Sequence, residues 1–145
     1  MTKSDTTEKG LESLIVAAMT GQAPPDLLPA ETSGEGASPL FQFPIWISGD
    51  AKDFDREYAV DLSQLRAFLD ATQDASAAAL ELDRAGPVRQ KFLARLQGEI
   101  TKRGVIDVLR TGVKHGAISL DLFYGTPSPG NAKAEELYAK NRFTV

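Results

Sequence analysis

The chain contains no cysteine and only one histidine, His115. Without thiols it cannot form disulfides or thiolate metal sites, and one imidazole cannot build a zinc site of several histidines. The lack of cysteine also fits a reducing compartment. No apolar run approaches the roughly 20 residues that a membrane helix needs, and Met1–Gly10 is polar, without the apolar centre of a signal peptide. We therefore expect a soluble, cytoplasmic protein with no membrane partner.

Several catalytic motifs are absent as well. The chain has no Gly-x-x-x-x-Gly-Lys-Ser/Thr phosphate loop and no Gly-x-Ser-x-Gly nucleophile turn. It has no Asp-bearing strand followed by a strand with Glu-x-Lys, so the core of a metal-dependent nuclease is incomplete. The net charge of −4 gives no general attraction to nucleic acid, although local basic patches are compatible with it.

Hydrophobic spacing predicts a mainly helical chain. Apolar residues recur at helical intervals from Leu11 to Met19, which predicts a helix over 8–20 capped by Thr6 or Thr7 and ended by Gly21. Asp61 is the expected N-cap of a second helix that carries Leu62, Leu65, Phe68 and Leu69. The other expected helices are 74–82, Pro87 to near Gly104, a continuation through Val113, and 131–140.

Two strands and two loops complete the expected α+β fold. Alternating residues predict a strand over 117–124, and Asn141–Val145 has the character of a second strand. Gly125–Gly130 is a stiff connector or a contact surface, and Gln22–Pro44 is a Pro/Gly-rich loop. An apolar cluster, Phe41–Ile47, closes this loop and could form a short strand or anchor the loop onto the helical core. A terminal strand needs a pairing partner, so we expect residues 1–145 to be a single partial domain, the N-terminal piece of a longer protein.

Acidic residues suggest one metal-site candidate. Glu8 and Glu12 lie four apart, so they share a helix face and could help to hold a divalent cation. The alternative is a solvated face with Glu8 near the positive end of the helix dipole. A second acidic group lacks the glycine and glutamate of a calcium loop, so capping and surface charge explain it better; it comprises Asp50, Asp53, Asp55 and Glu57.

Basic residues gather later in the chain. We call them the basic edge: Lys102, Arg103, Arg110, Lys114 and His115. Such an edge could contact DNA phosphates, and the alternative is an ordinary solvated face. No nucleophile motif accompanies His115, so we expect that residue to be structural or to hydrogen-bond the following loop.

Four long segments resemble one family, the N-terminal region of the R subunit of type I restriction endonucleases. They cover nearly the whole chain except Gln22–Pro44. The segments are EKGLESLIV (Glu8–Val16), DFDREYAVDLSQLRAFLDATQ (Asp53–Gln73), RQKFLARLQGEITKRGVIDVLRTGVKHG (Arg89–Gly116) and LDLFYGTPSPGNAKAEELYAKNRFTV (Leu120–Val145).

The resemblance implies the helical N-terminal part of a restriction-endonuclease-like nuclease domain with its first one or two strands. The full-length subunit of that family is a hydrolase that cleaves DNA with Mg²⁺ after ATP-driven translocation, as part of restriction-modification defence against foreign DNA. It works with methyltransferase and specificity subunits. The strand that opens with Asn141 begins the nuclease sheet, and the catalytic Asp and Glu-x-Lys follow it. By the same resemblance, Glu12 is the best match for an acidic residue beside the metal, with Glu8 second.

The resemblance therefore implies a chain that has no cofactor of its own and is catalytically silent. Two other functions remain open. A protein-interaction module would dock partner subunits through Gln22–Pro44 and the cluster Phe41–Ile47. A DNA-contacting accessory segment would use the basic edge.

Overall fold

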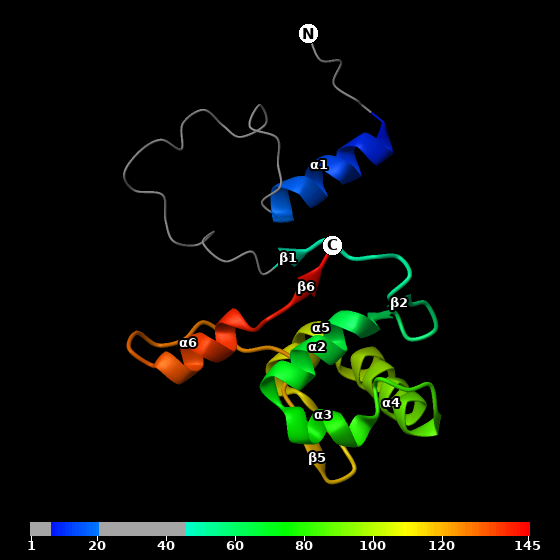
Figure 1. Cartoon of the computed structure of the whole chain (residues 1–145), viewed down its shortest axis with the longest axis vertical. Helices are drawn as coiled ribbons and strands as arrows, with labels where there is room; N and C mark the ends of the chain where they lie inside the picture. The colour runs from blue at the N-terminus through cyan, green and yellow to red at the C-terminus, as the bar shows by residue number, and fades with distance from the viewer. Residues whose placement is uncertain (1–6, 21–45) are drawn as a thin grey trace. The chain divides into compact units, whose positions relative to one another are not determined.

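The structure is a computed structural model, and it describes residues 7–20 and 46–145. The predicted loop Gln22–Pro44, the capping residues Thr6 and Gly21, and the cluster residues before Trp46 lie outside the described residues. About 55% of the described residues are helical, in six helices accompanied by three two-stranded sheets (Figure 1). The expected mainly helical α+β class is confirmed. None of the helices in the described ranges combines the length and apolarity needed to cross a membrane.

The chain divides into two compact units, the first formed by Met1–Ser48 with Phe143–Val145 and the second by Gly49–Arg142. In the first unit, α1 (Glu8–Thr20) contacts β1 (Trp46–Ile47). Thr7 caps α1 as expected, because its Oγ1 accepts from the Gly10 N–H at 3.1 Å.

Strand β1 pairs in parallel with β6 (Phe143–Thr144), and this pairing confirms the predicted second strand. Trp46 lies opposite Phe143, with ring centroids 5.3 Å apart. The Val145 N–H donates to the Ile47 carbonyl at 3.0 Å, which extends the ladder by one bond. Among its described residues, the first unit contains no fully buried side chain.

The second unit holds the hydrophobic core. Its principal helices are α2 (Leu62–Thr72), α3 (Asp74–Leu80), α4 (Pro87–Arg103) and α5 (Val105–Thr111). Helices α2 and α3 pack together, as do α4 and α5, and α3 also contacts α4. The largest fully buried side chains come from all four helices and the following hairpin: Leu69, Leu80, Phe92, Leu93, Val108, Val113 and Leu120.

Local capping explains where the elements begin. Asp61 Oδ1 accepts from the Gln64 N–H at 3.0 Å and starts α2, as expected. Pro87 occupies the first turn of α4, and Asn131 caps α6 (Ala132–Ala139). A short hairpin of β2 (Phe54–Asp55) and β3 (Val60–Asp61) was not expected. Asp55 Oδ1 accepts from the Glu57 and Tyr58 N–H groups in its turn, so the capping interpretation of this acidic segment is confirmed.

The prediction that a helix continues through Val113 is wrong. Helix α5 ends at Thr111 because Gly112 has φ +70, a conformation that L side chains rarely adopt. Val113 instead opens β4 (Val113–His115), which forms an antiparallel hairpin with β5 (Ile118–Leu120). Val113 pairs with Leu120, and both are buried, so tertiary pairing outweighs the helical spacing.

The strand predicted over 117–124 is also shorter than expected, because β5 ends at Leu120. Beyond it, side-chain amides bind the backbone. Gln73 donates to the Asp121 carbonyl at 2.8 Å and accepts from its N–H at 2.9 Å. Asn141 binds both backbone groups of Tyr124 in the same way. At the two ends of residues 121–124, the side-chain amides of Gln73 and Asn141 thus make the backbone hydrogen bonds that a paired strand would make.

Candidate functional site

The two candidate metal ligands remain on one helix face. Glu8 and Glu12 are both exposed on α1, one helical turn apart. Within the described part of the chain, no third histidine or carboxylate joins such a pair to form a cluster able to hold an ion. The structure thus brings these two carboxylates together, and their role in metal binding stays a prediction.

The basic edge is spread over three consecutive elements of the second unit. Lys102 and Arg103 close α4, Arg110 lies in the last turn of α5, and Lys114 and His115 belong to β4. Lys102, Arg110 and Lys114 are exposed. None of these three forms an ion pair with a carboxylate in residues 7–20 or 46–145. They are therefore the members of the edge that are available to an external anion.

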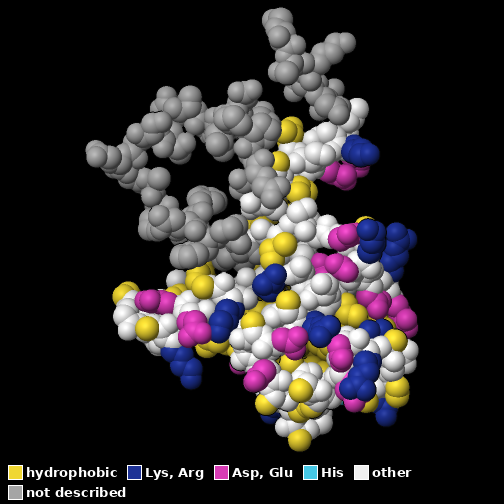
Figure 2. Space-filling model, in the orientation of Figure 1, with side chains coloured by type: hydrophobic (Ala, Val, Ile, Leu, Met, Phe, Trp, Pro, Cys, Tyr) yellow, Lys and Arg dark blue, Asp and Glu magenta, His cyan; other side chains and the backbone are white. Residues whose placement is uncertain are grey.

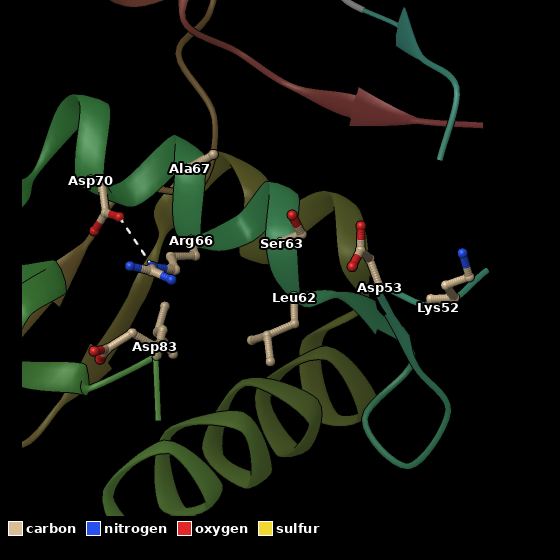
Figure 3. Close-up of a pocket in the computed structure, with 9 residues that line it drawn as sticks. Lys52, Asp53, Leu62, Ser63, Arg66, Ala67, Asp70 and Asp83 are labelled. Atoms are coloured by element: carbon tan, nitrogen blue, oxygen red, sulfur yellow. Dashed lines mark ion pairs between the residues drawn. The ribbon is translucent and has the colours of Figure 1, made fainter. Parts of the chain in front are cut away.

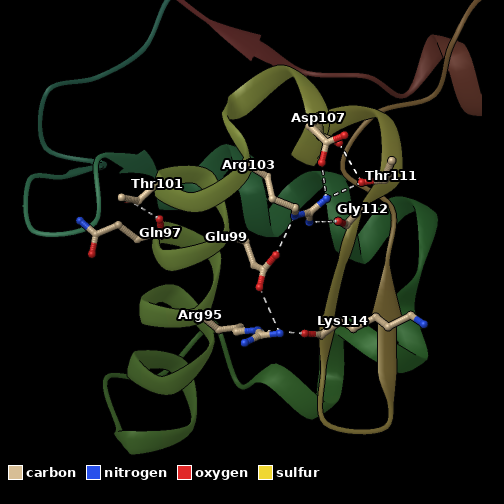
Figure 4. Close-up of polar contacts among 9 residues, drawn as sticks. All are labelled: Arg95, Gln97, Glu99, Thr101, Arg103, Asp107, Thr111, Gly112 and Lys114. Carbon is tan, nitrogen blue, oxygen red and sulfur yellow. Dashed lines mark hydrogen bonds and ion pairs between the residues drawn. The ribbon is translucent and has the colours of Figure 1, made fainter.

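Arg103 is engaged inside the fold (Figure 4). Its Nε donates to Glu99 at 2.7 Å, and its Nη1 donates to Asp107 Oδ2 and to Thr111 Oγ1, each at 2.6 Å. Its Nη2 donates to the Gly112 carbonyl at 2.9 Å. The hydrogen bonds to Asp107, first, and to Glu99 raise the pKa of Arg103, and partial burial opposes them. The guanidinium ties the end of α4 to α5 and to the glycine before β4.

Glu99 is shared by two arginines. Arg95 Nη2 lies 3.1 Å from Glu99 Oε1, and Arg95 Nε donates to the Lys114 carbonyl at 3.3 Å (Figure 4). The hydrogen bond from Arg103 is the largest cause of a lowered pKa of Glu99; partial burial opposes it, and nearby cationic charges add to it. Through these contacts α4 is fastened to the hairpin strand that carries Lys114.

His115 packs against the core. Its ring meets Phe92 edge-on, with centroids 5.6 Å apart and an interplanar angle of 77°. Phe92 is fully buried, whereas His115 is half-buried. A histidine placed in this way contributes apolar contact to the hairpin, which accords with the structural role expected for it.

A separate pocket of about 480 Å³ lies beside α2 (Figure 3). Leu62 and Leu82 are the larger apolar side chains of its lining, and Arg66 within it pairs with Asp70 at 3.4 Å. The remaining lining consists of Lys52, Asp53, Ser63, Ala67 and Asp83. The lining thus carries charges of both signs and no histidine. None of the predicted site residues lines this pocket.

Sequence reasoning missed the acidic partners of Arg103, although a signal was present. Glu99 and Asp107 stand four residues before and after Arg103, the spacing at which opposite charges meet on a helix. The two residues lie in different helices, because α4 ends before Gly104. The sequence therefore does not show that the Arg103 side chain still reaches Asp107. No protein-family model, curated protein or solved structure matches this chain.

Proposed function

We propose that this chain is the N-terminal part of the nuclease region of a type I restriction endonuclease R subunit. In that setting it packs against the nuclease sheet and helps to frame the DNA channel. DNA cleavage, with its Mg²⁺ and ATP, belongs to the full-length subunit, which works with methyltransferase and specificity subunits. Because the chain contains no Glu-x-Lys sequence, we propose no catalytic step by its own residues.

The parallel pairing of β1 with β6 is the observation that carries this proposal. Parallel strands normally occur in sheets of several strands with both faces covered. Here each strand has two residues, and Trp46 is exposed beside Phe143. Further strands beside β1 and β6 would complete such a sheet. The resemblance expects the nuclease sheet to begin at this segment.

Helix α1 supports the same proposal. Leu11, Leu14 and Ile15 lie on one face of the helix, at spacings of three and four residues, and all three are exposed. An apolar helix face of this kind is typical of a helix that covers a sheet. Glu12 and Glu8 lie on the same helix, so we propose them as acidic residues beside the metal of the full-length subunit.

The core of the second unit adds a further argument. Most of its buried residues come from the segments that resemble the R subunit: Phe68, Leu69, Phe92, Leu93, Leu96, Val108, Val113 and Leu120. Three of the four resembling segments therefore supply side chains to this core, whereas Glu8–Val16 belongs to the first unit.

The test of this proposal is a plasmid-cleavage assay with Mg²⁺, with and without ATP. We expect no nicked or linear DNA from this chain. Cleavage that copurifies with the chain and is lost on mutation of its own residues would contradict the proposal. A buffer-only lane and EDTA-treated protein serve as controls for contaminating nuclease.

DNA contact is a second candidate function. It is favoured by Lys102, Arg110 and Lys114, which are exposed and form no ion pair with the rest of the described chain. Phosphate contacts give an affinity that falls steeply with salt. Fluorescence anisotropy with a labelled duplex at increasing salt tests this function. An affinity that is undetectable or insensitive to salt argues against it.

The interaction-module alternative concerns the cluster Phe41–Ile47, of which Trp46 and Ile47 lie in the described part. Trp46 is exposed there, as a residue that docks a partner would be. Deleting Gln22–Pro44 and measuring assembly by light scattering tests this alternative. Assembly that is unchanged by the deletion argues against it.

A further inference from the structure

The second unit exposes large apolar side chains in two charged settings. Val105 and Ile106, at the start of α5, are 51% and 59% exposed, and Phe54 in β2 is 47% exposed. Single exposed apolar residues are ordinary on a protein surface. These are less ordinary, because each setting carries an excess of charge of one sign.

The first setting is positive, and we call it the junction surface: Lys102, Val105, Ile106 and Arg110. Ile106 and Arg110 are four residues apart on α5 and are therefore neighbours on its surface. Lys102 is three residues from Val105, so their Cα atoms lie within about 11 Å whatever the backbone conformation. Asp107 is the one acidic residue of α5, and its carboxylate pairs with Arg103 at 2.6 Å.

The second setting is negative, and we call it the acidic turn: Asp53, Phe54 and Glu57. All three residues are exposed. On the face of the molecule drawn in Figure 2, charged and apolar side chains are intermixed. The segment from residue 50 to 57 carries four carboxylates against two cations, Lys52 and Arg56, which gives it a net charge of −2. Asp55 is occupied by the backbone of its own turn, and Asp50 pairs with Lys52. Asp53 makes no ion pair with any described residue.

We propose that the junction surface of one copy of this chain binds the acidic turn of a second copy. Phe54 would cover Val105 and Ile106, and the carboxylates of the acidic turn would face the cations of the junction surface. Both halves of this complementarity, apolar and electrostatic, are present on the same chain. The contact joins two different surfaces and is therefore heterologous. A nucleic acid would satisfy Lys102 and Arg110 but would leave Val105 and Ile106 without an apolar partner.

Sedimentation velocity of the intact chain tests the contact, at concentrations from about 20 µM to 1 mM because a small contact gives weak affinity. We expect the weight-average sedimentation coefficient to rise with concentration. The rise should weaken when salt is increased from about 0.05 M to about 0.5 M, because salt screens surface charges. A wild-type chain that stays monomeric over the whole range overturns the proposal.

Charge reversal locates the contact. We expect Arg110→Glu and Asp53→Lys each to lower the association constant about tenfold or more, since like charges then oppose each other. Lys133→Glu and Glu135→Lys, on exposed positions of α6, make the same changes in net charge and should leave association unchanged. Thermal melts of all four variants confirm folding. Equal effects of the test and control variants overturn the proposal.

Mixing the two charge-reversal variants gives the most specific test of the contact. The Arg110→Glu chain keeps its acidic turn, and the Asp53→Lys chain keeps its junction surface. We expect the two variants to associate with each other more strongly than either variant associates with itself. The double variant Asp53→Lys/Arg110→Glu should regain self-association through swapped charges. A mixture that stays monomeric, or an Arg110→Glu chain that loses DNA affinity while its sedimentation is unchanged, overturns the proposal.

Discussion

The side chain of Asn141 binds both backbone groups of Tyr124. Its Oδ1 accepts from the Tyr124 N–H at 2.9 Å, and its Nδ2 donates to the Tyr124 carbonyl at 2.7 Å. Asn141 is buried, with 5% of its surface exposed. Because a buried amide and its partners lose their water, both bonds must be made within the protein. Asn141 thus fixes the residue before the loop Gly125–Gly130 to the end of α6.

Asn141→Asp should destabilise the fold by about 1–3 kcal/mol, because the change keeps the size of the side chain but removes the donor to the Tyr124 carbonyl. The matched control is Asn131→Asp. Asn131 caps α6 by accepting from the Ala134 N–H, and aspartate accepts equally well, so we expect a change below about 0.5 kcal/mol. Urea unfolding of both variants at neutral pH measures the difference. Equal stabilities of the two variants would contradict the role given to Asn141.

Two glycines make a second matched pair. Gly112 has φ +70, and a Cβ there would collide with the Leu120 backbone carbonyl, so Gly112→Ala should cost at least about 2 kcal/mol. Gly98 lies within α4 with open space where the methyl group of alanine would stand, so Gly98→Ala should stabilise by about 0.5–1 kcal/mol. Opposite shifts in unfolding temperature are therefore expected. A tolerated Gly112→Ala would argue against the tight hairpin contact.

Arg103 binds four partners through a planar, forked guanidinium, which lysine cannot reproduce. Arg103→Lys should therefore lower the unfolding temperature. Arg66→Lys alters a single, half-exposed pair with Asp70 and should lower it less. Differential scanning fluorimetry compares the two variants. Equal melting temperatures of the two variants would show that Arg103 does not hold α4 and α5 together in this way.

The lowered pKa of Glu99 predicts how the stability of the fold depends on pH. Its pKa in the folded chain is lowered, first by the hydrogen bond from Arg103, below its ordinary value of 4.5. A lowered folded-state pKa stabilises the protein above the unfolded-state value, and that stabilisation is lost as the pH falls through the folded-state pKa. The stability difference between wild type and Glu99→Gln should thus be largest near neutral pH and shrink below pH 4.5. The exposed Glu135→Gln serves as control. A difference that is constant with pH contradicts the assignment.

The elements that depend on local signals are the ones that the sequence predicts well. The caps Thr7 and Asp61 and the first-turn Pro87 act within three residues of their own position, so helix starts are visible without the fold. Gly112 can also be read from the sequence, but whether the helix ends there depends on Val113 pairing with Leu120 across a turn. Helical spacing alone could not show that strand pairing outweighs the helix at this point.

Contacts between distant segments lie beyond such local reasoning. Trp46 and Phe143 are neighbours in β1 and β6 although nearly the whole described chain separates them. The amide bonds of Gln73 to Asp121 likewise join α2 to the end of the hairpin. For the basic edge, the sequence shows which cations are present. Only the packing shows that Arg103 is engaged internally whereas Lys102, Arg110 and Lys114 are exposed.

The most direct test of the proposed identity is the coding DNA that follows the codon for Val145 in the source genome. We predict that the coding sequence continues with a strand bearing Glu-x-Lys and then with an ATPase phosphate loop, Gly-x-x-x-x-Gly-Lys-Ser/Thr. These are the nuclease and motor motifs that the resemblance implies and that residues 1–145 do not contain. Downstream coding sequence that lacks both motifs would contradict the assignment to a type I restriction endonuclease R subunit.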